Sequence, residues 1–538
     1  MKPNPENRFR ALAILAALGC ASALAVHAKA DEYHGINAGA PVWGSWIYFT
    51  DLRAAQTAAT GCRAVRINFR LDGHESWDPI ILGIYDAIIQ NAVNHDLAVL
   101  GLLCNECMPV GQTAWNDDPD GDGMNQYVLD YSTTALLLVD RYKTRIKRWE
   151  LWNEPNAYTN PDYRNDPQNA GGTYVLPRVY ANLMAETYKQ LNYYEGRSIL
   201  DRYCIELTSG GLLAYDGMTG MNYMAEVYAR TAVWDWMQAN TGRRYPWDLF
   251  GYHFYVNPGG RVSTNALRNL LEGSAWGKSV RALQGDYGDG APVLITEFGW
   301  NTQNVSEAIQ RDNMRTTCDW LEAKAYIAGT YWYQWQDEPG FSWGIVRSDG
   351  SHKLSYDEFD VQNGDPGPPV PPPAPIVSIS SSGADVPMLE PLGFTASVTL
   401  APDAAAAESI WHFGAAEIPV VGTAQPIEWT FTEPGDHEVW LAVTDCHEQT
   451  GVSNTLTIQV GTPLYSRADF DRDEDVDQSD FGHFQACLSG PGTNQNDPAC
   501  LSARFDDDGD VDQDDFGVLQ DCLSGPQASA DPWCGHWW

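Results

Sequence analysis

Two stretches of the sequence decide the fold: residues 149–156 read WELWNEPN, and residues 294–300 read LITEFGW. Each is an apolar, aromatic run of the kind that forms a buried strand, and each brings a glutamate, Glu154 or Glu297, to the end of that strand. Burying a carboxylate costs free energy unless the group is paired or used. We therefore interpret both glutamates as functional groups that stand at strand ends.

Six further apolar runs accompany these two, and amphipathic stretches such as residues 78–96 separate them. Buried strands that are each followed by a crossover, within about 330 residues, predict an α/β fold, the (β/α)8 TIM barrel. The alternative is a doubly wound sheet, which would need a Gly-rich phosphate loop after an early strand, and the sequence has none. The expected strands are residues 35–37, 64–70, 97–103, 148–153, 204–208, 249–255, 293–297 and 329–335.

Functional side chains of such a barrel stand at the C-terminal ends of its strands. Two carboxylates on strands across one barrel mouth suit the cleavage of a glycosidic bond. One protonates the leaving oxygen as an acid, and the other attacks the anomeric carbon. This chemistry needs no cofactor.

Residues 152–155 (WNEP) and 295–299 (ITEFG) resemble the acid/base and nucleophile strands of the clan A glycoside hydrolases, especially family 5 and its cellulase-like relatives. The resemblance covers about residues 35–340. It implies that Glu154 is the general acid/base and Glu297 the nucleophile, with a covalent glycosyl-enzyme and retention of configuration.

Supporting residues follow from the same resemblance. Asn153 matches the asparagine that binds the sugar 2-hydroxyl, and Tyr255 would orient the nucleophile. His253 would contact the sugar or the acid/base, unless it is a hydrogen-bonded core histidine. Arg66 matches the arginine that holds the nucleophile ionised, with a structural ion pair as the alternative.

Two further features concern the aromatic platform of the site and the choice between families of the clan. Strand eight reads YWYQW, from which we expect Trp335, rather than Trp332, to form an aromatic platform beneath the sugar. Strand three ends at Asn105-Glu106, where family 5 carries a histidine, and the YHFY wording of residues 252–255 also suits family 39 relatives.

Residues 1–30 have the pattern of a secretory signal peptide: a basic start, an apolar run over residues 11–26, and small residues at Ala28 and Ala30. We expect the mature chain to begin near Asp31 and to be secreted. The alternatives are a membrane anchor and lipid attachment at Cys20.

The remaining chain divides at a proline-rich linker, residues 364–375. The barrel occupies residues 31–363 before it. Residues 376–461 contain short alternating runs that predict an immunoglobulin-like β-sandwich. Residues 411–414 (WHFG) and 434–437 (PGDH) resemble the PKD domain family, and we interpret this part as a spacer.

Residues 462–538 contain a duplication, in which residues 470–491 and 505–526 share sixteen of 22 positions. The alternating carboxylates of each copy suit a loop that wraps oxygen ligands around Ca²⁺. The expected ligands are Asp469, Asp471, Asp473, Asp475 (through its backbone carbonyl), Asp477 and Asp480 in the first copy, and Asp506, Asp508, Asp510, Asp512 and Asp515 in the second.

Two such loops with Asp at position 12 resemble the dockerin type I family, which implies a cohesin-type scaffold protein as partner. Glu474 at position 6 and Arg504 at position 1 of the second loop depart from the family pattern, so the first loop is the better candidate. An acidic, disulfide-stapled tail that binds calcium weakly and no cohesin is the alternative.

The composition argues against two other classes of partner, nucleic acids and anionic membranes. Lys and Arg total 33 against 71 Asp and Glu, a formal charge of −38, which argues against binding to nucleic acid or an anionic membrane. Of the eleven cysteines, Cys20 lies in the expected signal peptide, and the even number that remains in an exported chain permits disulfides; four of them crowd the C-terminus. Cys104 and Cys107 are either a structural disulfide or two inert thiols.

Altogether the sequence predicts a secreted retaining β-glycosidase, endoglucanase-like or mannanase-like, that acts on a plant-type polysaccharide such as cellulose, mannan or xylan. One alternative is an exo-acting β-xylosidase-like enzyme of the same clan. The other is a non-catalytic glycan-binding or scaffold-attached module, against which the presence of both Glu154 and Glu297 argues.

Overall fold

The computed structural model describes residues 34–43, 46–193, 198–364, 372–401, 404–420, 422–423, 426–506 and 508–536. The chain divides into two compact units, the first ending at Pro371 and the second starting at Pro372. The expected signal peptide and most of the proline-rich linker lie outside the described residues. Among the residues described, no helix is long and apolar enough to cross a membrane.

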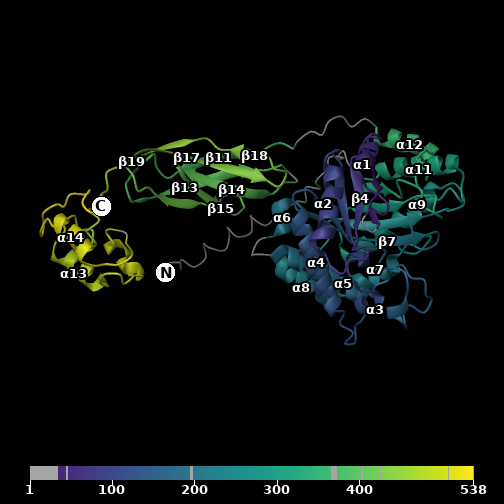
Figure 1. Cartoon of the computed structure of the whole chain (residues 1–538), viewed down its shortest axis with the longest axis horizontal. Helices are drawn as coiled ribbons and strands as arrows, with labels where there is room; N and C mark the ends of the chain where they lie inside the picture. The colour runs from purple at the N-terminus through teal and green to yellow at the C-terminus, as the bar shows by residue number, and fades with distance from the viewer. Residues whose placement is uncertain are drawn as a thin grey trace, which may run out of the picture. The chain divides into compact units, whose positions relative to one another are not determined.

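The first unit is built on a closed barrel of eight parallel strands in the order β1-β10-β9-β8-β7-β6-β5-β4, with helices around it (Figure 1). Each strand pairs with its predecessor along the chain, and β1 closes the ring against β10. The predicted barrel is therefore confirmed. Its strands are β1 (His34–Asn37), β4 (Ala64–Phe69), β5 (Ala98–Leu103), β6 (Arg148–Asn153), β7 (Glu206–Tyr215), β8 (Phe250–Tyr255), β9 (Val293–Phe298) and β10 (Ile327–Trp332).

The helices that cover the barrel start and end at residues that the sequence marks. In α2, for example, the Asp78 carboxylate caps the helix by accepting from Ile80 N and Ile81 N, and Pro79 occupies the first turn. The larger helices are α1 (Asp51–Ala58), α2 (Pro79–Val93), α4 (Gln126–Tyr142), α5 (Pro177–Tyr193), α7 (Met221–Tyr228), α8 (Thr231–Thr241), α9 (Thr264–Leu271), α10 (Val280–Tyr287), α11 (Glu307–Glu322) and α12 (Leu354–Asn363). Shorter elements on the loops are β2 (Val42–Trp43), β3 (Trp46–Ile47), η2 (Asn105–Cys107), α3 (Gln112–Trp115), η3 (Pro167–Asn169) and α6 (Ile199–Tyr203).

An apolar cluster made of strand residues lies below the polar groups of the barrel. Because side chains of a strand alternate between its two faces, the residue two positions further along points the same way. Ala64 and Leu294 belong to this cluster, and Arg66 and Thr296 follow them by two positions. The polar layer thus rests on an apolar floor. The floor consists of Ala64, Leu100, Leu249, Leu294 and Tyr331.

A register shift in β9 places two consecutive side chains on the inside. Tyr252 of β8 pairs with Ile295, but His253 pairs with Glu297, so Thr296 is the extra residue of a bulge. Thr296 and Glu297 both direct their side chains to groups inside the barrel mouth. Strict alternation would have turned one of them away.

The second unit begins with two sheets that share one apolar core around Phe394, Trp411 and Leu441. The predicted short strands are present, while the assignment to the immunoglobulin or PKD type stays a prediction. One sheet contains β11 (Ile376–Ser381), β13 (Pro391–Thr399) and β16 (Ile427–Thr430). The other contains β12 (Asp385–Pro387), β19 (Leu456–Gly461), β17 (Gly435–Asp445), β14 (Ala406–Phe413), β15 (Ala416–Val420) and β18 (Thr450–Val452).

The duplicated segment forms two similar halves that interlock. Each half has a loop and a helix, α13 (Gln478–Cys487) or α14 (Gln513–Cys522), and the short η5 (Pro498–Ala503) lies between them. The turn after each helix donates two backbone N–H groups to the loop of the other half, at Val476 O and Val511 O. Disulfides join Cys487 to Cys500 and Cys522 to Cys534.

The two cysteines of the CxxC motif in the first unit are free thiols and do not form a disulfide. Cys104 and Cys107 are free and buried. Burial raises the pKa of Cys104 to about 12 and raises that of Cys107 well above its usual value. Neither thiol is therefore ionised near neutral pH, which leaves them as inert packing residues.

Candidate active site

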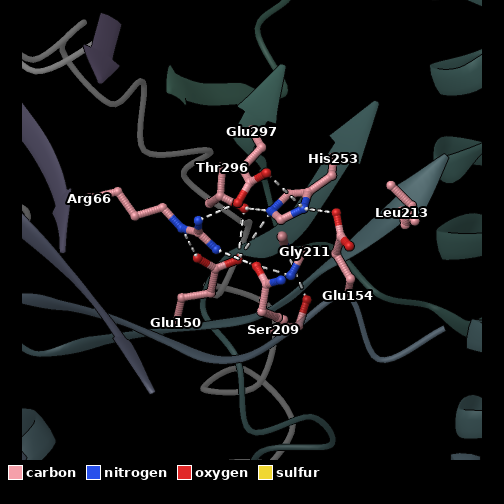
Figure 2. A network of polar contacts seen from close by, with 12 residues as sticks. Arg66, Glu150, Glu154, Ser209, Gly211, Leu213, His253, Thr296 and Glu297 are labelled. Carbon is pink, nitrogen blue, oxygen red and sulfur yellow. Dashed lines mark hydrogen bonds and ion pairs between the residues drawn. The ribbon is translucent and has the colours of Figure 1, made fainter. Parts of the chain in front are cut away.

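A buried arginine lies at the centre of the polar layer in the barrel mouth (Figure 2). Arg66 on β4 donates from Nε to Glu150 Oε2 at 2.6 Å and from Nη1 to Glu297 Oε1 at 2.6 Å. Nη1 also reaches Asn37 Oδ1, and Nη2 reaches Asn153 Oδ1, both at 2.9 Å. The guanidinium thus connects β1, β4, β6 and β9 at one point.

The carboxylate partners of Arg66 keep its guanidinium protonated. Burial alone would lower the pKa of the guanidinium, but the carboxylates of Glu150 and Glu297 more than offset this and raise it. Asn37 supports the arrangement from the adjacent strand, since its Nδ2 donates to Thr296 O and Trp332 O. Arg66 therefore remains cationic and keeps a fixed orientation.

Glu150 on β6 is the main site residue that sequence reasoning did not assign. It is fully buried, and its Oε1 accepts from Gly211 N at 2.9 Å and from Thr296 Oγ1 at 2.7 Å. Burial would raise the pKa of its carboxyl, but the Arg66 charge and the His253 contact lower it to about 2. A glutamate in the middle of an apolar strand was the available signal, because it requires a buried cation.

His253 on β8 links the two predicted catalytic carboxylates. Its Nδ1 lies 3.1 Å from Glu154 Oε1 and 3.8 Å from Glu297 Oε2, and its Nε2 lies 2.9 Å from Thr296 Oγ1. Burial lowers the pKa of the imidazole, but the charge of Glu297 and the contacts with Glu150, at 3.7 Å, and Glu154 raise it to about 9. His253 is therefore a cation at neutral pH.

Glu297 on β9 is almost buried and both of its oxygens are bound. Oε1 accepts from Arg66, and Oε2 accepts from the hydroxyl of Tyr255 at 2.6 Å. Burial raises the pKa of Tyr255 well above its usual value, and the charge of Glu297 adds to this. The Tyr255 hydroxyl thus stays a hydrogen-bond donor that orients the carboxylate.

Glu154 follows β6 in a left-handed backbone conformation, with φ of 47°. Its N–H donates to Gly211 O at 3.0 Å, and its carbonyl accepts from Thr173 Oγ1 at 2.9 Å. A carboxylate oxygen of Glu154, a carboxylate oxygen of Glu297 and a ring nitrogen of His253 all lie within 4.8 Å of one another. The two predicted catalytic carboxylates therefore share one mouth.

The aromatic residue near the site differs from the one that the sequence predicts. Trp335 and Trp332 are both buried, at 2% and 1% exposure, and Trp335 packs against Tyr356 instead of reaching the site. Tyr333 takes the place that we expected for Trp335, with its ring near Tyr255 and Trp343. The strand ladder ends at Trp332, so alternation along β10 does not extend to position 335.

Two further acidic groups of the first unit are bound elsewhere. Glu106, in the position of the expected family 5 histidine, accepts from Asn68 Nδ2 and lies 3.3 Å from Arg70 Nη2. Asp118, which opens a short Asp/Gly turn, is bound by Arg178 Nε. Neither contacts the two catalytic candidates.

Three carboxylates of the first C-terminal loop converge on one point. Oxygen atoms of Asp469, Asp471 and Asp480, at positions 1, 3 and 12, lie within 4.8 Å of one another. Burial and neighbouring carboxylates raise the pKa of Asp469 and Asp471. Asp473 and Asp477 lie on the same loop, where each accepts a backbone N–H two residues further on. These residues fit Ca²⁺.

The second loop fits Ca²⁺ less well. Asp510, Asp512 and Asp515 converge within 4.8 Å, at positions 7, 9 and 12. Asp506 and Asp508 each accept a backbone N–H of the loop. Arg504 occupies position 1 and cannot act as a ligand, so this loop lacks one of the usual carboxylates.

No protein-family model and no curated protein matches this chain. Similar solved structures include an endo-β-1,4-mannanase from Thermotoga petrophila, with 12% identity, a TM-score of 0.40 and coverage of 81% of this chain and 99% of that one. A family 39 glycoside hydrolase from Bacteroides cellulosilyticus WH2 has 16% identity, a TM-score of 0.40 and coverage of 74% and 80%. An exo-β-1,4-mannosidase from Opitutaceae bacterium strain TAV5 has 15% identity, a TM-score of 0.41 and coverage of 62% and 59%. At this distance the activity has to be inferred from the site itself.

Gly211 leaves the space that the His253 ring occupies. A Cβ at this position would lie 2.1 Å from His253 Nε2 and 2.7 Å from Thr296 Oγ1. We expect Gly211→Ala to lower the free energy of unfolding by about 1–3 kcal/mol, through overpacking. Gly83→Ala, in α2 with open space around it, is the control and should be neutral or stabilising. Urea unfolding measures both, and equal stability of the two variants would contradict this packing.

The raised pKa of His253 predicts a pH-dependent stability. Protonation of His253 favours the folded state fully below its unfolded pKa of about 6.5, and this contribution is lost as the pH rises through about 9. We expect the free energy of unfolding to fall over this range and to fall less in His253→Gln. Urea titrations at several pH values measure it, with His95→Gln on the surface as control. The same slope in His253→Gln and wild type would refute the assignment.

Proposed function

We propose that this protein is a retaining β-glycoside hydrolase in which Glu297 is the nucleophile and Glu154 the general acid/base. The observation that carries the proposal is the distance below 4.8 Å between a carboxylate oxygen of each. Retaining enzymes hold their carboxyl groups about 5–5.5 Å apart, whereas inverting enzymes leave about 6.5–9.5 Å for a water molecule. The spacing supports direct attack on the sugar.

In the first step, a Glu297 oxygen attacks the anomeric carbon, and the bond to the leaving oxygen breaks as Glu154 donates its proton to that oxygen. Arg66 and Tyr255 each bind one oxygen of Glu297 and keep the carboxylate aligned, which reduces the reorganisation needed for the attack. The products of this step are the free leaving group and a glycosyl ester on Glu297.

In the second step, Glu154 takes a proton from water, and the water oxygen attacks the anomeric carbon and releases Glu297. His253 can donate from Nδ1 to Glu154 Oε1, which leaves Oε2 to carry the catalytic proton. Esterification removes the charge of Glu297, which is the main partner that raises the pKa of His253. The imidazole thus couples the state of the nucleophile to the acid/base.

For the substrate, we propose a plant-type polysaccharide such as cellulose, mannan or xylan, cleaved in an endoglucanase-like or mannanase-like manner. An exo-acting β-xylosidase-like activity is the alternative within the same chemistry. The buried network around Glu297 speaks against a purely glycan-binding module, since binding alone does not require a fixed carboxylate beside a second one.

The remaining parts of the chain extend this proposal. Residues 1–30 would direct the enzyme out of the cell, and residues 376–461 would act as a PKD-like spacer. The first C-terminal loop would hold Ca²⁺ through Asp469, Asp471 and Asp480, which would neutralise its crowded carboxylates and order the loop. The dockerin-like repeats would bind a cohesin-type scaffold protein.

The roles of the two glutamates can be distinguished by comparing substrates whose leaving groups do or do not need a proton. Glu297→Gln should reduce kcat by roughly 10,000-fold or more on every substrate, because the covalent step is lost. Glu154→Gln should reduce cleavage of oligosaccharides by about 100–10,000-fold but spare glycosyl transfer from a dinitrophenyl glycoside, whose leaving group needs no proton. Burst kinetics and reducing-sugar release on cellulose, mannan and xylan substrates measure these effects.

A matched control is Glu358→Gln, which changes a buried carboxylate paired with Arg315 outside the site. It should keep wild-type turnover even if it loses stability. Full turnover by Glu297→Gln, with its thermal unfolding unchanged, would rule out the proposed nucleophile.

Calcium binding can be tested on the full chain by isothermal titration with calcium chloride. Asp471→Asn, at an exposed ligand position, should weaken the tighter calcium site about 10-fold or more, since a charged ligand is lost. Asp436→Asn, an exposed change on β17, should leave it unaltered. Absence of calcium uptake by the wild-type protein would refute the proposed site.

A further inference from the structure

Lys353 is a buried charged residue that the proposed mechanism does not use. It lies directly before α12, and its side chain is only 2% exposed. Its Nζ donates to Thr302 Oγ1 at 3.0 Å, to Asp337 Oδ1 at 2.7 Å and to Ser342 O at 3.1 Å. Three acceptors match the three hydrogens of an ammonium group. The Lys353 ammonium therefore has one fixed orientation.

The acceptors of Lys353 come from two loops at the C-terminal end of the barrel. Thr302 follows β9, and Asp337 and Ser342 follow β10. The two loops also bind each other, since Thr302 N and Thr302 Oγ1 both donate to Ser342 O. Loss of the ammonium would remove the cation that pairs with the Asp337 carboxylate, whose side chain is 12% exposed. Lys353 thus joins the ends of two neighbouring strands.

The segment between Asp337 and Gly344 is held at both ends. Asp337 Oδ1, which accepts from Lys353, also accepts from Gly344 N at 2.8 Å. A Cβ at Gly344 would lie 2.4 Å from Asp337 N, so this close approach requires glycine. Trp343 lies between two residues that Lys353 fixes, Ser342 directly and Gly344 through Asp337.

The ring of Trp343 packs against the tyrosine that binds the proposed nucleophile. It stands edge-on to Tyr255, with ring centroids 5.1 Å apart and an interplanar angle of 71°. Tyr333 stands edge-on to both of these rings. Edge-to-face contacts favour a defined orientation of the rings. Because the Tyr255 hydroxyl donates to Glu297 Oε2 at 2.6 Å, a shift of the Trp343 ring would move the donor of this hydrogen bond.

We propose that Lys353 is a positioning residue that fixes Trp343 against Tyr255. The Trp343 ring then keeps the Tyr255 hydroxyl aligned with the carboxylate of Glu297. The inference rests on the proposed function and deepens it, since it names a residue that acts on the nucleophile through two aromatic rings. Loss of Lys353 should slow the attack of Glu297 and leave proton donation by Glu154 unaffected.

A dinitrophenyl glycoside tests this assignment, because its leaving group needs no proton and its burst phase reports the attack of Glu297. The substrate is the glucoside, mannoside or xyloside that turns over fastest. We expect Lys353→Met to lower the burst rate constant at saturating substrate about 10-fold, with KM changed less than about two-fold. Trp343→Ala, on the loop itself, should lower the same rate constant. Arg315→Met removes the cation paired with buried Glu358 and is the control for lost stability, with a wild-type rate.

A double-mutant cycle tests the path through Tyr255. In the Tyr255→Phe background, adding Lys353→Met should lower the burst rate constant less than about two-fold, because both changes remove the same alignment. An equal loss from Lys353→Met in both backgrounds, or a wild-type rate in Lys353→Met itself, would overturn the positioning role and leave Glu297 as nucleophile.

The same cycle measured by urea unfolding separates failure of the inference from failure of the proposed function. A wild-type protein without turnover on every glycoside would refute the hydrolase. Non-additive losses of unfolding free energy in Lys353→Met and Tyr255→Phe would then still support the link between the two residues. Additive losses in that inactive protein would overturn the link as well.

Discussion

The site depends on one constraint, the compensation of a guanidinium buried inside the barrel. Arg66 lies where four strands meet, and its acceptors come from Asn37, Glu150, Asn153 and Glu297. An unpaired charge at this depth would be strongly destabilising, so the acceptors and the cation must be kept together. The position of Glu297 is consequently fixed by the same contacts that make the barrel interior stable.

Charge balance extends this constraint to the acid/base. Arg66 and His253 supply two positive charges, and Glu150 and Glu297 supply two negative ones, all within a part of the barrel shielded from solvent. A proton on Glu154 leaves this balance intact. In the proposed mechanism, esterification of Glu297 would remove one negative charge, and an ionised Glu154 beside His253 would restore neutrality. The two protonation states of a retaining mechanism are thus both electrostatically tolerable in the same cluster.

Local sequence motifs were sufficient to locate the eight barrel strands, although β7 (Glu206–Tyr215) runs seven residues past the predicted range 204–208. Asn153 and Tyr255 end their strands, and Arg66 and His253 lie within theirs, so the barrel fixes the direction of all four side chains. Glu150 was missed, since its partner lies 84 residues away and the pairing depends on register. The bulge that lets the consecutive residues Thr296 and Glu297 both face inward leaves no mark in composition. The prediction that Trp335 forms the aromatic platform was wrong because β10 ends at Trp332. The alternation of side chains cannot be extended past the last paired residue of a strand.

The backbone around Glu154 is held from two sides. A left-handed conformation at a glutamate is costly and persists only where neighbours hold it, here Gly211 on one side and Thr173 on the other. Gly211 also contacts Glu150 and leaves room for His253, whereas Thr173 precedes Tyr174 on the loop between β6 and α5. Glu154 is therefore held both by the strand that carries Gly211 and by the loop that carries Thr173 and Tyr174.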